Sequence, residues 1–266
     1  MKEKLKTLRW FAARPDHWAH AAALVARKVK PDHDRADRRS DATEWAILQA
    51  RPVEEVVRAL GYAGSFSEFD AIVGEDQMQQ AEQRVAACPV KMGGAGDVRL
   101  LYYACEAIAA RRVLETGVAY GWSSLAILAS LTKRPGSLLT SVDMPYPKMN
   151  NSDWVGIAVP ERFQPAWRLI RQPDRNGIGK ALALQGGTLD LCHYDSDKSY
   201  YGRMWAYPQL WSALRAGGIF ISDDIQDNLA FKEFTETRNV ASMVIESQGK
   251  YVGLCIKPVT ELASAQ

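Results

Sequence analysis

The stretch VLETGVAYGWSS (residues 113–124) contains an apolar strand, a glycine-rich turn and the start of a helix. Its apolar beginning predicts a short buried strand that ends at Glu115, and Gly117 and Gly121 bracket the bend that follows. An apolar helical run starts at Ser123. Glycines let the backbone approach a ligand closely, and the free amides at a helix start attract negative charge. The stretch therefore predicts a cradle for a nucleotide-like ligand.

The spacing of this turn is E-x-G-x-x-x-G and not the dinucleotide spacing G-x-G-x-x-G. It resembles the first motif of the class I methyltransferases that use S-adenosylmethionine (SAM). The resemblance implies that Glu115, Gly117, Gly121 and Ser123 bind SAM. Glycine turns also join strands to helices for purely structural reasons, so the turn alone leaves both readings open.

A second predicted strand ends in Asp143, 22 residues beyond Gly121. In nucleoside-binding α/β folds an acid at this spacing accepts hydrogen bonds from the ribose hydroxyls, although an acid at a strand end can also cap a turn. This pairing does not distinguish NAD from SAM. The resemblance to SAM enzymes adds Asp174, at the position that commonly holds the adenine edge. It also adds Gly94, in a loop near the amino-acid end of SAM where a plain hinge is equally consistent.

Carboxylates follow two further predicted strands. The run LDLCHYD ends in Asp195, and the run IFIS is followed by Asp223 and Asp224. Because the carboxyl ends of parallel strands face one crevice, we expect these three side chains to converge. Converging carboxylates repel each other unless a cation or a positive side chain lies among them, and oxygen ligands suit Mg²⁺, Ca²⁺ or Mn²⁺.

The pattern D-x-D-x-x-Y from Asp195, followed by P-x-L-x-x-x-L-x-x-G-G-x-x-x-x-D-D, resembles the macrocin-type sugar O-methyltransferases and, in its logic, catechol O-methyltransferase. This resemblance covers roughly residues 91 to 258. It implies that Asp195, Asp223 and Asp224 bind Mg²⁺ and that Lys198 is the general base, with Asp224 in place of the asparagine of the catechol enzyme.

A lysine is a poor base at its ordinary pKa, so the role of Lys198 requires burial or a neighbouring cation that lowers its pKa. His193 is the rival base because its charge normally changes near neutral pH. Its alternative role is that of a buried histidine whose hydrogen bonds are satisfied within the core. Asp197 is a further candidate ligand or base, or an exposed acid at a helix start.

Residues 242–246 and 251–256 flank a polar turn and predict a terminal hairpin. An antiparallel hairpin that completes a parallel sheet is a feature of the methyltransferase fold that the ordinary dinucleotide fold lacks. We therefore expect an α/β protein with a doubly wound, seven-stranded, mostly parallel sheet. Residues 1–90 are expected to form a helical N-terminal extension and residues 91–266 the methyltransferase domain.

The chain has 266 residues, 47% hydrophobic content and a formal charge of only +2. Residues 1–30 carry eight basic side chains against Glu3 and Asp16, so the remainder of the chain is net negative. This distribution disfavours a nucleic-acid partner. The basic, aromatic-containing N-terminus permits a weak contact with an anionic membrane surface, but a helix packed on its own protein or on a partner fits better.

The four cysteines, Cys88, Cys105, Cys192 and Cys255, lie far apart in apolar patterns and are expected to be reduced core residues. No secretory signal or membrane-spanning run is visible, which predicts a cytoplasmic protein. We also expect a homo-oligomer formed through the helical extension.

The sequence thus predicts a SAM-dependent O-methyltransferase that acts on a hydroxyl of a small molecule or sugar, assisted by a divalent metal. Two other readings stay open at this point. One is an NAD-dependent oxidoreductase, which the turn spacing and the lack of a Tyr-x-x-x-Lys pair weaken. The other is a SAM-binding module without catalysis, in which Asp195, Lys198 and Asp223 would be dispensable.

Overall fold

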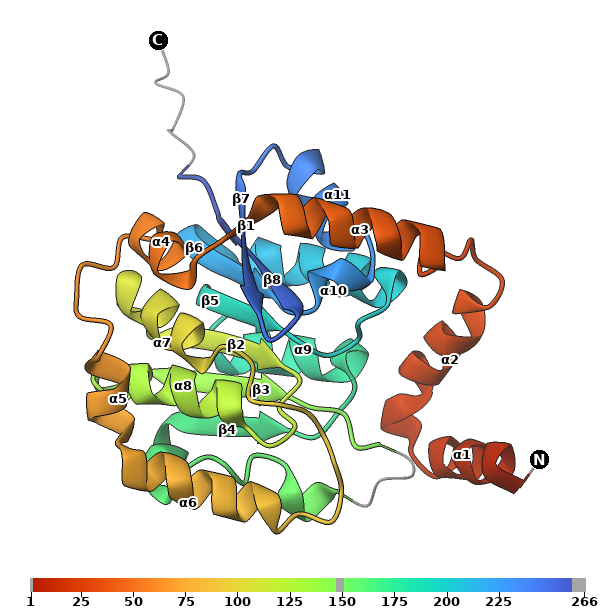
Figure 1. Ribbon diagram of the computed structural model, residues 1–266. Coiled ribbons are helices and arrows are strands. Elements are labelled where there is room, and N and C mark those ends of the chain that lie inside the picture. Colours follow the sequence, from red (N-terminus) through yellow and green to blue (C-terminus); the bar gives the residue numbers. More distant parts are fainter. Residues whose placement is uncertain (1, 147–150, 260–266) are drawn as a thin grey trace.

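The computed structural model describes residues 2–146 and 151–259, and a mixed β-sheet forms its centre (Figure 1). Within these residues the sheet has eight strands in the order β1-β7-β8-β6-β5-β2-β3-β4. The strands are β1 Ala50–Arg51, β2 Arg112–Thr116, β3 Leu138–Val142, β4 Trp167–Ile170, β5 Leu189–Tyr194, β6 Leu214–Ser222, β7 Ser242–Ser247 and β8 Lys250–Ile256. Neighbouring strands run parallel except for β8, which is antiparallel to both β6 and β7. The predicted mostly parallel sheet with a C-terminal hairpin is confirmed.

The short strand β1 was not expected from the sequence. It comes from the N-terminal part of the chain and pairs in parallel with β7, with Ala50 opposite Val244 and Arg51 opposite Ile245. Part of the predicted helical extension therefore adds to the edge of the sheet. The boundary between residues 90 and 91 stays a prediction.

Helices cover both faces of the sheet. Successive strand residues point to opposite faces, so Val113 belongs to one hydrophobic core and Leu114 to the other. The first core includes α4 Val53–Ala59, α5 Glu68–Val73, α6 Glu75–Ala86, α7 Val98–Ala107 and α8 Trp122–Leu131. The second includes α3 Ala36–Gln49, α9 Asp174–Leu184, α10 Tyr200–Ala213 and α11 Ala230–Thr237. In Figure 1, α1 Lys2–Ala12 and α2 Trp18–Arg27 stand beside the carboxyl ends of the parallel strands.

Short 3₁₀ helices occupy several of the connections. They are η1 Pro15–His17, η2 Ser152–Trp154, η3 Glu161–Ala166 and η4 Ile225–Asp227. Cys105, Cys192 and Cys255 are buried and Cys88 is half-buried, and all four are free thiols, as the sequence predicted. In the described part of the chain, no helix is long and apolar enough to cross a membrane.

The carboxyl ends of the central strands are aligned. The ladder continues one residue past each strand, because the Asp195 amide donates to the Thr116 carbonyl (2.8 Å) and the Asp223 amide donates to the Tyr194 carbonyl (3.0 Å). This register places the residue that follows β2, Gly117, next to Asp195, and Asp195 next to Asp223. The predicted convergence of these strand ends is confirmed.

Gly117 permits the closest of these approaches. Its φ is +80°, and a Cβ atom built on it would lie 2.1 Å from the carbonyl oxygen of Asp195, well inside any contact distance. The positive φ disfavours other residues, and the backbone of β5 leaves no space for a side chain. Position 117 therefore requires glycine on both grounds.

We expect Gly117→Ala to lower the free energy of unfolding by about 3 kcal/mol, because left-handed strain and overpacking add at this position. Gly136→Ala is the matched control. Gly136 has nearly the same φ, +79°, but apart from its own chain neighbours no atom of the described residues lies within 4 Å of the place that a Cβ would take. This control should cost only about 1 kcal/mol, the strain alone. Urea denaturation of both variants measures the difference, and equal losses would contradict the steric argument.

Candidate functional site

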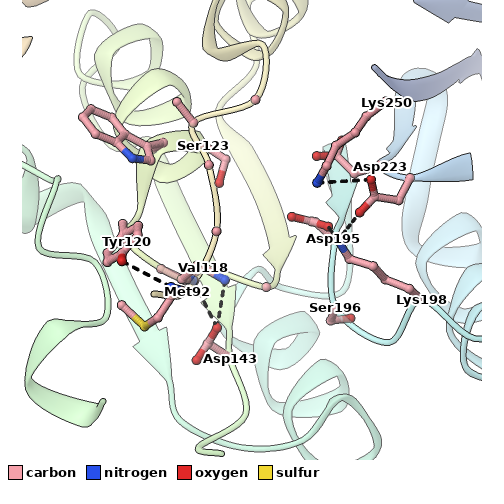
Figure 2. Close-up of a pocket in the computed structure, with 18 of the residues that line it drawn as sticks. Met92, Val118, Tyr120, Ser123, Asp143, Asp195, Ser196, Lys198, Asp223 and Lys250 are labelled. Carbon is pink, nitrogen blue, oxygen red and sulfur yellow. Dashed lines mark hydrogen bonds and ion pairs between the residues drawn. The ribbon is translucent and has the colours of Figure 1, made fainter. Parts of the chain in front are cut away.

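A cavity of about 670 Å³ opens at the carboxyl edge of the parallel strands. Figure 2 shows the turn after β2, with Val118 and Asp143, on one side and Asp195, Lys198, Asp223 and Lys250 on the other. Ten of the candidate residues from the sequence line it, namely Gly94, Gly117, Ser123, Asp143, Asp174, Asp195, Asp197, Lys198, Asp223 and Asp224. Glu115, Gly121 and His193 do not belong to its lining.

Asp143 follows β3 and faces the glycine turn. Its Oδ1 accepts hydrogen bonds from the amides of Val118 (2.9 Å) and Ala119 (3.4 Å), and its Oδ2 pairs with Arg171. Its side chain is almost fully buried. Asp143 therefore holds the turn in shape, which is one of the two roles that the sequence left open, and its contact with a ribose stays a prediction.

Glu115 lies beneath the turn and not in the cavity. It is fully buried, and its Oε2 accepts hydrogen bonds from the hydroxyls of Ser124 (2.5 Å) and Ser141 (2.7 Å). Gly121 is also away from the cavity, where a Cβ would meet the Cα of Gly156 at 2.8 Å. The structure thus places these two motif residues where they shape the turn by packing and hydrogen bonding.

Asp174 begins α9 at the far side of the cavity from the β7–β8 hairpin. Its Oδ2 accepts hydrogen bonds from the hydroxyls of Ser196 (2.5 Å) and Tyr194 (3.3 Å). Burial raises its pKa to about 6 despite these hydrogen bonds, because desolvation disfavours the ionised form. This partly protonated carboxyl can donate or accept a hydrogen bond at the edge of a heterocycle.

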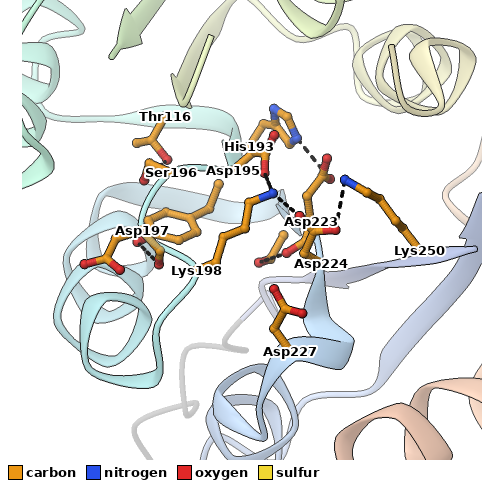
Figure 3. A network of polar contacts seen from close by, with 12 residues as sticks. Thr116, His193, Asp195, Ser196, Asp197, Lys198, Asp223, Asp224, Asp227 and Lys250 are labelled. Carbon is orange, nitrogen blue, oxygen red and sulfur yellow. Dashed lines mark hydrogen bonds and ion pairs between the residues drawn. The ribbon is translucent and has the colours of Figure 1, made fainter. Parts of the chain in front are cut away.

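Three carboxylates and two ammonium groups meet at the ends of β5 and β6 (Figure 3). Lys198 Nζ contacts Asp195 Oδ1 (3.2 Å) and hydrogen-bonds Asp224, and Lys250 Nζ lies 3.3 Å from the other Asp224 oxygen. The positive charge that converging carboxylates require is therefore supplied by lysines in this arrangement.

Asp195 has a carboxylate oxygen that accepts no hydrogen bond from the described residues. This atom, Oδ1, is buried, and the ammonium of Lys198 contacts it without hydrogen-bond geometry. Burial and the negative charge of Asp223 raise the pKa of Asp195 to about 7, although Lys198 opposes this shift. The Asp195 side chain as a whole is one-third exposed and lines the cavity, so a ligand can reach this carboxylate.

Lys198 does not have the lowered pKa that a lysine base needs. Burial disfavours its charge, but Asp195 and Asp224 outweigh burial and raise its pKa above the usual value. In this arrangement Lys198 is an ammonium ion without a free lone pair. It suits stabilisation of negative charge better than removal of a proton.

His193 is buried beneath the cluster, with its Nε2 3.2 Å from Asp223 Oδ1 and its Nδ1 3.6 Å from Glu115 Oε1. Burial lowers its pKa, but the two carboxylates outweigh this and raise it to about 10. His193 is thus a buried core histidine, one alternative from the sequence, but only its Nε2 has a hydrogen-bond partner; Nδ1 has none among the described residues. The rival role as a base would require contact with the cavity, and His193 is not among the residues that line it.

Arg203 of α10 fixes the backbone that carries the paired aspartates, and no sequence pattern pointed to it. It is fully buried, and its Nη2 donates to the carbonyls of Asp223 (3.0 Å) and Asp224 (2.9 Å). Asp224 has a φ of +51°, an uncommon conformation for a residue with a side chain. The guanidinium holds this turn, so that both carboxylates point toward the cavity edge (Figure 3).

The predicted Mg²⁺ ligands offer the right chemistry but not a ready-made site. Asp195, Asp223 and Asp224 supply only oxygen atoms, which suit a hard cation. Among the described residues, however, no group of three or more histidine, cysteine or acidic side chains is arranged to hold a metal ion. Lys198 and Lys250 pair with the Asp224 oxygens instead.

Other cavity residues escaped the sequence analysis because they come from distant segments. Lys250, Ser247 and Gln248 belong to the tip of the β7–β8 hairpin, and His20 and Leu24 belong to α2. The polar turn predicted between the last two strands could have pointed to Ser247, Gln248 and Lys250 as candidate cavity residues. Nothing in the N-terminal sequence indicated that α2 reaches the cavity.

Comparisons with known proteins agree with this geometry. The family model described as a methyltransferase domain matches residues 114–225. No curated protein matched the chain. The solved O-methyltransferase from Bacillus cereus in complex with SAH is 13% identical over 76% of this chain and 100% of that one, with a TM-score of 0.55. The O-methyltransferase TomG from Streptomyces achromogenes, involved in tomaymycin synthesis and solved with SAM, is 16% identical over 71% and 94%, with a TM-score of 0.53.

At these identities the solved structures show a shared fold, and the family model identifies the region that contains the glycine turn and the strand-end aspartates. Residues 114–225 thus match a methyltransferase-domain model, and the chain shares the class I methyltransferase fold of these solved O-methyltransferases.

Proposed function

We propose that this protein transfers the methyl group of SAM to a hydroxyl oxygen of a small molecule or sugar. The observation that carries the proposal is that one cavity is lined both by the glycine turn and by the strand-end aspartates and lysines. The glycine turn and Asp143 suit the donor on one side, and Asp195 and Lys198 suit a reacting hydroxyl on the other. The solved relatives with SAM or SAH in their descriptions are O-methyltransferases, which supports the same reaction here.

The size of the cavity supports a small acceptor. Cavities that bind small molecules and cofactors usually enclose about 300–1,000 Å³, and the volume here, about 670 Å³, lies within that range. A nucleic-acid acceptor has no support from the overall charge of +2. The identity of the acceptor depends on the side chains around its end of the cavity.

In the proposed reaction the acceptor oxygen attacks the methyl carbon of SAM, the carbon–sulfur bond breaks and neutral S-adenosylhomocysteine (SAH) leaves. The hydroxyl proton must leave the acceptor oxygen. The Asp195 carboxylate lines the cavity and can receive it. The ammonium of Lys198 stabilises negative charge that develops on the acceptor oxygen, so Lys198 assists without being the base.

A divalent metal is a further part of the proposal. Its support is the convergence of Asp195, Asp223 and Asp224 and the resemblance of the D-x-D-x-x-Y and D-D patterns to metal-assisted O-methyltransferases. When bound, Mg²⁺ lowers the pKa of a hydroxyl that it touches. These three carboxylates would hold it.

The sheet topology supports SAM as the donor over NAD. The antiparallel strand β8 lies between β6 and β7, and this is the arrangement that distinguishes the methyltransferase fold from the ordinary dinucleotide fold. A module that binds SAM without transfer would have no use for the lysine and aspartate cluster at the cavity, so we favour an enzyme. Homo-oligomer formation, a weak membrane-surface contact and a cytoplasmic location stay predictions.

Calorimetry tests the choice of donor. We expect the protein to bind SAM and SAH but not NAD. Asp143→Asn should weaken SAH binding roughly tenfold or more, because a hydrogen bond to a charged carboxylate is lost from the ribose. The asparagine retains an acceptor oxygen for the Val118 amide, so the turn should survive. Asp153→Asn, at an exposed position, is the matched control. NAD binding without SAM or SAH binding would overturn the proposed function.

A second prediction concerns Asp195. We expect Asp195→Ala to reduce methyl transfer about 100-fold or more, since the group that receives the proton is gone. The measurement is SAH formation in a screen of phenol and sugar acceptors, with SAH affinity determined in parallel. Asp153→Ala should leave transfer unchanged. Full transfer by Asp195→Ala would contradict its role, whereas lost SAH affinity would show that it binds the donor.

The metal prediction has its own test. We expect transfer to fall on chelation with EDTA and to return when Mg²⁺ is added, and Asp223→Asn to weaken Mg²⁺ binding measured by calorimetry without acceptor. Turnover that is unchanged in EDTA would show that the ammonium groups of Lys198 and Lys250 supply the positive charge by themselves.

A further inference from the structure

We propose that α2 forms a wall of the donor site at its nucleoside end, with His20 and Leu24 against the adenosyl group of the bound donor. This inference rests on the proposed function, because it takes SAM as the ligand. It assigns a binding role to a helix that lies far outside the matched family region, residues 114–225.

The placement of two side chains is the first argument. His20 and Leu24 are four residues apart, so they lie on the same face of α2, and both line the cavity. On other faces of the same helix, Trp18 and Val25 are 57% and 68% exposed. The cavity face of α2 is therefore distinct from its solvent face.

The neighbours of α2 identify which end of the cavity it closes. α2 packs against α9, which begins at Asp174. The negative charge of Asp197 raises the pKa of His20, so the two side chains lie near each other. Asp197 follows Ser196, whose hydroxyl donates a hydrogen bond to Asp174. The glycine turn and Asp143 bind the ribose side in the proposed function, so Asp174 and α2 lie where the base of the nucleoside extends.

Polar contacts at both ends hold α2 in this place. At its C-terminal end Arg27 Nη2 lies 2.6 Å from Asp197 Oδ2, and both side chains are partly buried. Just before the helix, Asp16 accepts a hydrogen bond from Gln172 (3.2 Å). A helix fixed at two points can present its side chains to a ligand without a large ordering cost on binding.

The segment that follows α2 also contacts the turn between β5 and α10, which carries the D-x-D-x-x-Y pattern. The His33 ring stacks on Tyr200 with 4.1 Å between ring centroids. Asp34 Oδ1 accepts hydrogen bonds from the Tyr200 amide (2.8 Å) and from Asn228 Nδ2 (2.8 Å). The N-terminal segment therefore contacts the D-x-D-x-x-Y turn over several residues, which ties the position of α2 to the centre of the site.

The two side chains suit the flat, mostly apolar face of an adenine ring. Leu24 offers aliphatic surface, and His20 offers an aromatic ring. Burial lowers the pKa of His20, so its ring is neutral at neutral pH and adds no charge beside the base. Asp174 meanwhile offers a polar group for the ring edge.

The test uses the full-length protein and calorimetric titration with SAH and with adenosine. We expect Leu24→Ala and His20→Ala each to weaken binding roughly tenfold, because apolar contact with the base is lost. Both ligands should lose affinity by a similar factor, since they share the nucleoside. Val25→Ala, on the exposed face of the same helix, should bind within about twofold of wild type. Circular dichroism and the thermal midpoint without ligand check that each variant folds.

A variant of the helix attachment provides the second measurement. Arg27→Ala should also weaken adenosine binding, and Arg27→Lys should restore part of it by keeping the charge near Asp197. If wild type binds SAH and the α2 variants bind both ligands equally well, the role of α2 is overturned and the proposed function stands. If wild type binds neither SAM nor SAH, the proposed function and the inference fail together.

Discussion

The contact between Gly117 and the backbone of Asp195 is the constraint on which the rest of the site depends. The Asp195 carbonyl oxygen can lie this close to residue 117 only because glycine has no side chain. Because the two strands meet at that point, the turn after β2 and the end of β5 share one edge. The same register then brings β6 alongside, so that the glycine turn and the carboxylates open into one cavity.

Charge balance is the second requirement of this edge. Glu115, His193 and Asp223 alternate in sign from the buried layer beneath the glycine turn to the rim of the cavity. Lys198 and Lys250 continue that alternation around Asp224, and Arg203 holds the backbone from behind. Each of these acids has at least one basic side chain beside it, which offsets the cost of placing a charge away from water. Asp195 differs, because its Oδ1 accepts no hydrogen bond from any cation among the described residues.

Much of this arrangement could be predicted from the sequence, since it follows from local pattern and from the geometry of parallel strands. The acids at positions 143, 195, 223 and 224 come at strand ends, and strand ends share one edge whatever the details of packing. The position of Glu115 below the turn could not be predicted in this way, because its partners Ser124 and Ser141 are chosen by packing between a helix and a strand.

The charge states of side chains and the contacts of distant segments also depend on tertiary packing, so they could not be predicted from local sequence patterns. Lys198 was a candidate base by its spacing from Asp195, but its pKa depends on Asp224, which a separate strand supplies. The contribution of α2 was invisible because the pattern of that helix indicates only that it has an apolar face, not what the face meets. The short strand β1, two residues long, is below the length at which alternation can be recognised.

The reversed direction of β8 has a consequence for how such a protein can change. Because β8 runs against β6, the loop that connects it to β7 is delivered to the same rim as the strand ends that carry the aspartates, although it lies outside the matched family region. This loop joins the last two strands along the chain, so residues can be inserted or exchanged there without disturbing any crossover helix. Evolution thus has a place to reshape the hairpin end of the cavity while the glycine turn stays as it is.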